Sequence, residues 1–132
     1  MEQTMRVLLV DNHQLVRQVL ARALAAEPDL FVVGQAATGQ EAIDLTRQLE
    51  PEVVLMNVRL TSLSGVDATR AILAEFPWMC VIGMTLVENA AEAQAIREAG
   101  AVACISKSGP LEGLLAAIRA CPRKPNTVSA GK

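Results

Sequence analysis

A fivefold alternation along the chain is the strongest constraint on its fold. Five short runs rich in β-branched residues are each followed by a longer segment whose apolar residues recur at helical spacing. This alternation is typical of parallel strands joined by helices, which cover both faces of the sheet. We therefore predict an α/β domain with a doubly wound, five-stranded parallel sheet. The expected strands are Arg6 to Val10, Leu30 to Ala36, Glu52 to Asn57, Met79 to Met84 and Val102 to Ile105.

The intervals between these runs predict the helices. Apolar stripes fill the first three intervals, and a weaker stripe over Glu88 to Glu98 predicts the fourth helix. The last helix is expected over Pro110 to Ala120, with proline in its first turn. Pro51 and Pro77 are expected just beyond helix ends, because the residue before a proline disfavours the helical conformation.

Size and charge limit the functions that the chain can have. With 132 residues and 52% hydrophobic content, the chain can form one core, so we expect one domain over 1–121 and a polar tail over 122–132. Its 12 basic and 14 acidic residues give a net charge of −2, which argues against a nucleic-acid surface. Apolar runs fall far short of the about 20 residues that span a bilayer, and residues 1–10 lack the pattern of a signal peptide, so none is expected. A cytoplasmic protein without membrane contact is expected.

The three cysteines indicate neither a disulfide framework nor a zinc site. Cys80, Cys104 and Cys121 are odd in number and widely spaced, with no C-x-x-C pair. We expect reduced, mostly buried thiols, with Cys80 and Cys104 packed as small apolar side chains on neighbouring strands.

Polar residues follow four of the expected strands. The first strand ends at Asp11 and Asn12, the third at Asn57 and the fourth at Thr85, and the fifth leads into Lys107. Ligands of open parallel sheets bind outside the carboxyl ends of the strands. These five side chains are therefore expected to converge on one rim and to form the candidate site.

Several motifs occur together in the order and spacing of one known family. They are Leu8-Leu9-Val10-Asp11-Asn12-His13, Val53-Val54-Leu55-Met56-Asn57-Val58-Arg59-Leu60 with Gly65, Met84-Thr85, Gly100-Ala101 and Ser106-Lys107. Over roughly residues 5 to 121 the chain resembles the receiver domain of two-component response regulators, most closely receivers that precede a helix-turn-helix output domain. The resemblance implies the flavodoxin-like strand order 2-1-3-4-5.

The resemblance also implies roles for the rim residues. In the family, an aspartate at the end of the third strand accepts a phosphoryl group from a histidine kinase, with Mg²⁺ neutralising the charge. By position, Asn57 matches that acceptor and Asp11 the first acidic residue. Lys107 and Thr85 match the lysine and the hydroxyl residue that hold the phosphoryl oxygens, and Cys104 stands where the family's switch aromatic usually stands.

Two amides replace carboxylates in this pattern. Asn57 cannot attack as a carboxylate or form an acyl phosphate, so ordinary phosphotransfer to this position is excluded. Asn12 takes the second acidic position, so the degenerate metal site of Asp11, Asn12 and Asn57 is expected to bind Mg²⁺ weakly or not at all, and no other cofactor is expected. A direct contact between Asp11 and Lys107 is predicted in place of the metal.

Further departures leave the origin of the site open. Thr61 and Ser108 stand where the family often has proline, and Cys104 is too small to report a switch movement as an aromatic ring does. These losses favour a naturally degenerate receiver, and a single Asp-to-Asn replacement in a conventional receiver is the alternative. His13 is expected to be a capping or surface residue at the start of the first helix, without a catalytic role.

The sequence is consistent with two functions. The first is a phosphorylation-independent protein-interaction module that contacts partners through the fourth helix, fifth strand and fifth helix, or through the first and fifth helices. The second is a conventional receiver cut from a DNA-binding transcriptional regulator. The expected partner is a histidine kinase or another signalling protein, with a homodimer left open and no nucleic acid bound by this domain alone. An independent enzyme is not expected, since no P-loop, G-x-S-x-G elbow or G-x-G-x-x-G fingerprint occurs.

Overall fold

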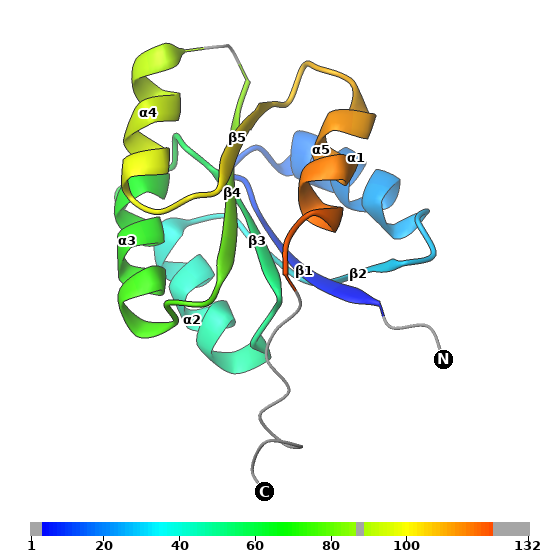
Figure 1. Ribbon diagram of the computed structural model, residues 1–132, viewed down its shortest axis with the longest axis horizontal. Helices are drawn as coiled ribbons and strands as arrows, with labels where there is room; N and C mark the ends of the chain where they lie inside the picture. The colour runs from blue at the N-terminus through cyan, green and yellow to red at the C-terminus, as the bar shows by residue number, and fades with distance from the viewer. Residues whose placement is uncertain (1–3, 87–88, 123–132) are drawn as a thin grey trace, which may run out of the picture.

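The computed structural model describes residues 4–86 and 89–122. Five parallel strands form one sheet in the order β2-β1-β3-β4-β5, which confirms the predicted architecture and strand order (Figure 1). Helices α1 and α5 cover one face of the sheet, and α2, α3 and α4 cover the other. The elements are β1 (Met5–Val10), α1 (Gln14–Ala25), β2 (Leu30–Ala36), α2 (Gly39–Leu49), β3 (Val53–Asn57), α3 (Gly65–Glu75), β4 (Cys80–Thr85), α4 (Ala90–Glu98), β5 (Ala103–Ser106) and α5 (Leu111–Arg119).

The strand boundaries differ from the predicted ones by single residues. β4 and β5 each begin and end one residue later than expected, so Thr85 is the last residue of β4 and pairs with Ser106. The carbonyl oxygen of Thr85 accepts a hydrogen bond from the backbone N–H of Lys107 at 2.6 Å, which extends the ladder to the rim. β1 begins one residue earlier and β3 one residue later than expected.

Two apolar layers sandwich the sheet. Strands β3 and β4 are buried along their whole length, which explains why their sequences are almost continuously apolar. One layer joins α1 and α5 to the sheet through fully buried side chains such as Leu24 and Ile118. The other layer joins α2, α3 and α4 through residues such as Ile72 and Ile96. This packing fixes the carboxyl ends of the strands relative to one another.

Side chains cap three of the helix starts. Thr38, Ser64 and Asn89 precede α2, α3 and α4, and each accepts a hydrogen bond from the backbone N–H three residues later. The fourth helix therefore begins at Ala90, directly after Asn89. Glu88, the first residue of the predicted helix, lies outside the described residues. α5 begins at Leu111, one residue later than predicted, because Pro110 has an extended backbone and is the N-cap residue, so it does not lie in the first turn.

The cysteines differ from the sequence expectation. Cys80 and Cys121 form a disulfide bond, and their Cα atoms are 6.1 Å apart. The prediction of reduced thiols is therefore wrong for these two residues, although both are buried as expected. The reason is topological, because the last helix returns across the sheet and brings residue 121 to the start of β4, 41 positions earlier in the chain. Cys104 is a free, half-buried thiol on β5.

No helix within residues 4–86 and 89–122 is long and apolar enough to cross a bilayer. Apart from Pro122, the predicted polar tail over 122–132 lies outside the described residues.

Candidate functional site

The predicted rim residues lie together at the carboxyl edge of the sheet. Asp11 directly follows β1, Asn57 ends β3, Thr85 ends β4 and Lys107 directly follows β5. Asn12, Asn57, Thr85 and Lys107 line one pocket of about 460 Å³, and Asp11 lies fully buried beneath it. The fold therefore brings all five predicted side chains into one site.

The predicted contact between Asp11 and Lys107 is present. Lys107 Nζ donates to Asp11 Oδ2 at 2.7 Å, and the two side chains are 4% and 0% exposed. The other carboxylate oxygen, Oδ1, accepts the backbone N–H of His13 at 2.9 Å and lies 3.3 Å from His13 Nδ1. Both oxygens of the buried carboxylate are thus engaged by groups of the protein itself, as burial of a charge requires.

His13 occupies the N-cap position of α1, as predicted, but its side chain makes no capping hydrogen bond. Its ring, with the side chain 55% exposed, turns toward Asp11 instead. The neighbouring Arg17 donates to the backbone carbonyl oxygen of Asp11 at 2.6 Å. These contacts hold the β1–α1 connection in place beside the pocket.

Asn57 is held by two hydrogen bonds of its amide nitrogen. Nδ2 donates to Asn12 Oδ1 at 3.0 Å and to the carbonyl oxygen of Arg59 at 2.8 Å. The residue is 3% exposed. A close approach of α3 supports this end of β3, because a Cβ atom on Gly65 would lie 2.1 Å from the Asn57 carbonyl oxygen. Only glycine fits at this position. The Gly65 N–H also donates a hydrogen bond to the carbonyl oxygen of Val58 at 2.9 Å.

The residues at this rim do not fit the Mg²⁺ ion that the family resemblance implies. Mg²⁺ binds in proteins mainly through carboxylates, and both carboxylates at this rim are engaged, Asp11 by Lys107 and His13 and Glu92 by Arg59. The side-chain oxygen of Asn12 and the carbonyl oxygen of Arg59 both accept hydrogen bonds from the Asn57 amide. Within residues 4–86 and 89–122, no three His, Cys, Asp or Glu side chains are grouped to hold a metal ion.

Thr85 and Cys104 form a contact that the sequence did not predict. The Thr85 hydroxyl lies close enough to the Cys104 side chain to lower the pKa of its thiol. Burial raises the pKa of the Cys104 thiol, while Arg97 and the Thr85 hydroxyl act in the lowering direction. The predicted hydroxyl position is therefore occupied by a buried residue that faces β5 as well as the pocket.

An ion pair beside the pocket was also missed. Arg59, which follows β3, pairs with Glu92 in the first turn of α4, and both residues line the pocket with Asn89. The signal in the sequence was weak, since an acidic residue in a first helical turn is common wherever the helix dipole favours it. This pair links the β3–α3 connection to α4.

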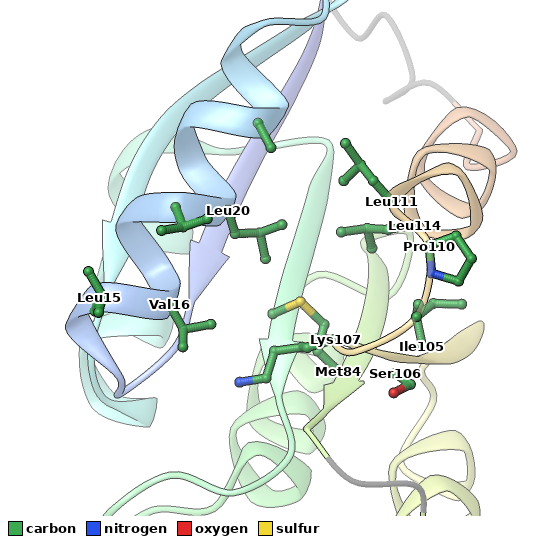
Figure 2. A pocket seen from close by; sticks show the side chains of 13 residues that line it. Leu15, Val16, Leu20, Met84, Ile105, Ser106, Lys107, Pro110, Leu111 and Leu114 are labelled. Atoms are coloured by element: carbon green, nitrogen blue, oxygen red, sulfur yellow. The ribbon is translucent and has the colours of Figure 1, made fainter.

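A second pocket lies on the other side of Lys107. This α1–α5 groove, of about 420 Å³, runs between α1 and α5 above β4 and β5 (Figure 2). Leu15, Val16 and Leu20 line it from α1, and Leu111 and Leu114 line it from α5. Leu15 and Val19 are 74% and 61% exposed at its edge. Lys107 lines both pockets, so its stem separates the rim from this apolar groove.

Comparison with known proteins identifies relatives of the whole domain. The family model described as "Response regulator receiver domain" matches residues 7–119. The chain is 40% identical over 114 residues to the response regulator GacA of Pseudomonas viridiflava, covering 86% of this chain and 53% of that protein. It is 35% identical over 118 residues to the transcriptional regulatory protein LiaR of Bacillus subtilis, covering 89% and 56%. The chain thus spans about half the length of these curated relatives.

Solved structures agree with the sequence comparison. The response regulator domain of Thermotoga maritima CheB superposes with a TM-score of 0.83 at 31% identity. The match covers 90% of this chain and 96% of that one. The similarity therefore extends over nearly all of the domain.

Proposed function

Because this chain belongs to the response regulator receiver family, and is thus a receiver domain of two-component signalling, we propose that it signals without phosphoryl transfer to Asn57. One observation carries this proposal. The residue at the acceptor position is an amide whose nitrogen is hydrogen-bonded to Asn12 and Arg59. A receiver in this condition acts as a protein-interaction module without enzymatic activity of its own.

The chemistry of the rim supports this proposal. Phosphoryl transfer needs a nucleophilic oxygen and positive charge at the transferred group. The Asn57 amide supplies no carboxylate, and the ammonium group of Lys107 is engaged by Asp11 at 2.7 Å. The ammonium group that would hold a phosphoryl oxygen in the family is thus already bonded to a carboxylate of the rim.

A histidine kinase or another signalling protein is the proposed partner. Two surfaces are available for it, the α4–β5–α5 face and the α1–α5 face. Val102, before β5, is 61% exposed, and Leu15 on α1 is 74% exposed. Exposed apolar side chains of this size favour protein contacts. With a net charge of −2 we propose no nucleic-acid contact by this domain, so any regulation of transcription falls to segments beyond it.

A second candidate is a conventional receiver silenced only at Asn57. The observation that favours it is that Thr85 and Lys107 still line the same pocket as Asn57, in the positions that the family uses. Under this hypothesis a single amide replaces the acceptor carboxylate, and the rest of the site stays competent for phosphoryl transfer.

The test is intact-mass analysis after incubation with Mg²⁺ and acetyl phosphate. The protein is compared with three variants: Asn57→Asp, the double variant Asn57→Asp with Asn12→Asp, and Asn89→Asp as the control. The control adds a carboxylate to the same pocket but not at the end of β3. Asn89 caps α4 through its side-chain oxygen, which aspartate retains.

Each outcome decides between the candidates. We expect the protein and the Asn89→Asp control to gain no phosphoryl group. A phosphoryl group on the single variant Asn57→Asp establishes the second candidate, because one residue then silences an otherwise competent site. If only the double variant is modified, or no variant is, the site has lost more than its acceptor, as the first candidate requires. A phosphoryl group on the unaltered protein at the rim would overturn the first candidate.

A further inference from the structure

The disulfide between Cys80 and Cys121 ties the last helix to the sheet. Cys80 is the first residue of β4, at the edge of the sheet opposite the candidate site. Cys121 follows Ala120, the C-cap of α5. The bond therefore joins the end of the last helix to β4, an inner strand of the sheet.

Helix α5 is held at both of its ends. Just before it, Lys107 is bound to Asp11 by a buried ion pair. At its far end, Arg119 bonds to Asp29 at 2.8 Å and to Glu27 at 2.9 Å, and the disulfide follows two residues later. Between these ends the helix buries only three side chains, which are Leu114, Leu115 and Ile118. A nine-residue helix with three buried side chains depends strongly on what fixes its ends.

From this arrangement we propose that Cys80 and Cys121 form a redox-controlled clamp that determines how firmly α5 is held on the sheet. In the oxidised state the clamp fixes the α5 wall of the α1–α5 groove. In the reduced state the last turn of α5 is released, and that wall becomes mobile. The redox state of the two cysteines thereby sets the shape of the groove that Leu111 and Leu114 line.

The chemistry is thiol–disulfide exchange with a dithiol reductant. A thiolate of the reductant attacks the sulfur of Cys121, the S–S bond breaks, and Cys80 leaves as a thiolate that takes a proton from water. The second thiol of the reductant attacks the mixed disulfide, so it leaves oxidised and Cys121 is released as a thiol. Cys121 is the more exposed of the two, at 6% against 3%. It follows the last helix, where local opening costs less than global unfolding.

The third cysteine provides an internal control. Cys104 lies on β5 as a free thiol, outside the clamp. Alkylation in denaturant, followed by intact-mass analysis, therefore distinguishes the two states. One labelled cysteine is expected for the protein oxidised with glutathione disulfide, and three are expected after treatment with dithiothreitol.

The test compares hydrogen exchange of the oxidised and reduced protein, element by element. We expect the amides of α5 to exchange at least about tenfold faster after reduction, with changes below about twofold in α2 and α3, which do not contact the bond. Cys121→Ser and Cys80→Ser should show the fast α5 exchange in both redox conditions. Cys104→Ser should keep the redox response. Because the comparison of the unaltered protein involves no substitution, it stands even if a serine variant fails to fold.

Three results would overturn the proposal. The first is labelling of all three cysteines after oxidation, which would mean that the bond does not form. The second is an unchanged exchange rate in α5 after the bond is broken. The third is an equal acceleration in every helix, which would show that the bond stabilises the whole domain without clamping α5 in particular.

Discussion

Removing the charge of Lys107 should destabilise the domain strongly. In Lys107→Met the apolar stem remains, but the Asp11 carboxylate, which is 0% exposed, keeps only its contacts with His13. Breaking a buried ion pair by removing one partner costs about 3–5 kcal/mol. We expect a value near the lower end, about 3 kcal/mol, because Lys107 borders two pockets through which water reaches the unpaired carboxylate.

The Asp11→Asn variant should cost a similar amount, because it leaves the Lys107 ammonium group without its partner. The double variant should lose no more than about 3 kcal/mol in total, since neither charge then remains buried and unpaired. The coupling energy between the two substitutions is therefore expected to be about 3 kcal/mol, at the upper end of measured couplings.

Urea unfolding of the four proteins at one pH measures this cycle. A cycle on Asp67 and Arg70 is the matched control, because these residues form an exposed ion pair at 3.0 Å with side chains 57% and 60% exposed. Its coupling should be below about 0.5 kcal/mol. If the Asp11 and Lys107 costs simply add, with a coupling below about 1 kcal/mol, the contact does not act as a buried ion pair and the reasoning fails.

Three further predictions concern the cysteines and one glycine. Cys121→Ser should lower the free energy of unfolding in non-reducing urea titrations by about 4 kcal/mol, because the lost disulfide closes a loop spanning 41 positions in the unfolded chain. Cys104→Ser should have a much smaller effect. Gly100→Ala should cost about 2 kcal/mol in the same titrations, because φ is +119° and the new Cβ would lie 2.3 Å from Leu73. Burial raises the pKa of Cys104, so less thiolate is present at pH 8, and its alkylation by iodoacetamide should be slower than that of a cysteine peptide.

The sheet could be predicted because its signal repeats along the chain. Each buried strand is a continuous apolar run, and each crossover carries a helical stripe, so errors in single residues did not change the topology. The boundaries were less certain. The sequence predicts Thr85 just beyond β4, yet its pairing with Ser106 keeps it in the strand. No sequence pattern distinguishes the last paired residue of a strand from the first unpaired one.

The site was predictable in its position and in its buried ion pair, but not in its other contacts. The rule for parallel sheets places Asp11, Asn57 and Lys107 at one edge, and charge complementarity then predicts the Asp11–Lys107 pair. The disulfide was missed because its two cysteines have no characteristic spacing, and only the packing of α5 brings them together. The proximity of Thr85 to Cys104 was missed for the same reason, since it depends on the pairing of β4 with β5.

The orientation of the Asn57 amide determines what the pocket prefers to bind. The carbonyl oxygen of Arg59 can only accept a hydrogen bond, so the amide must present its nitrogen there, and the second hydrogen of that nitrogen goes to Asn12. The group that Asn57 offers to an entering molecule is therefore its side-chain oxygen, an acceptor. A phosphate dianion carries acceptors alone and is poorly matched to it. A molecule that brings its own N–H or O–H groups, such as a peptide amide or an alcohol, is matched better, because these groups can donate to that oxygen.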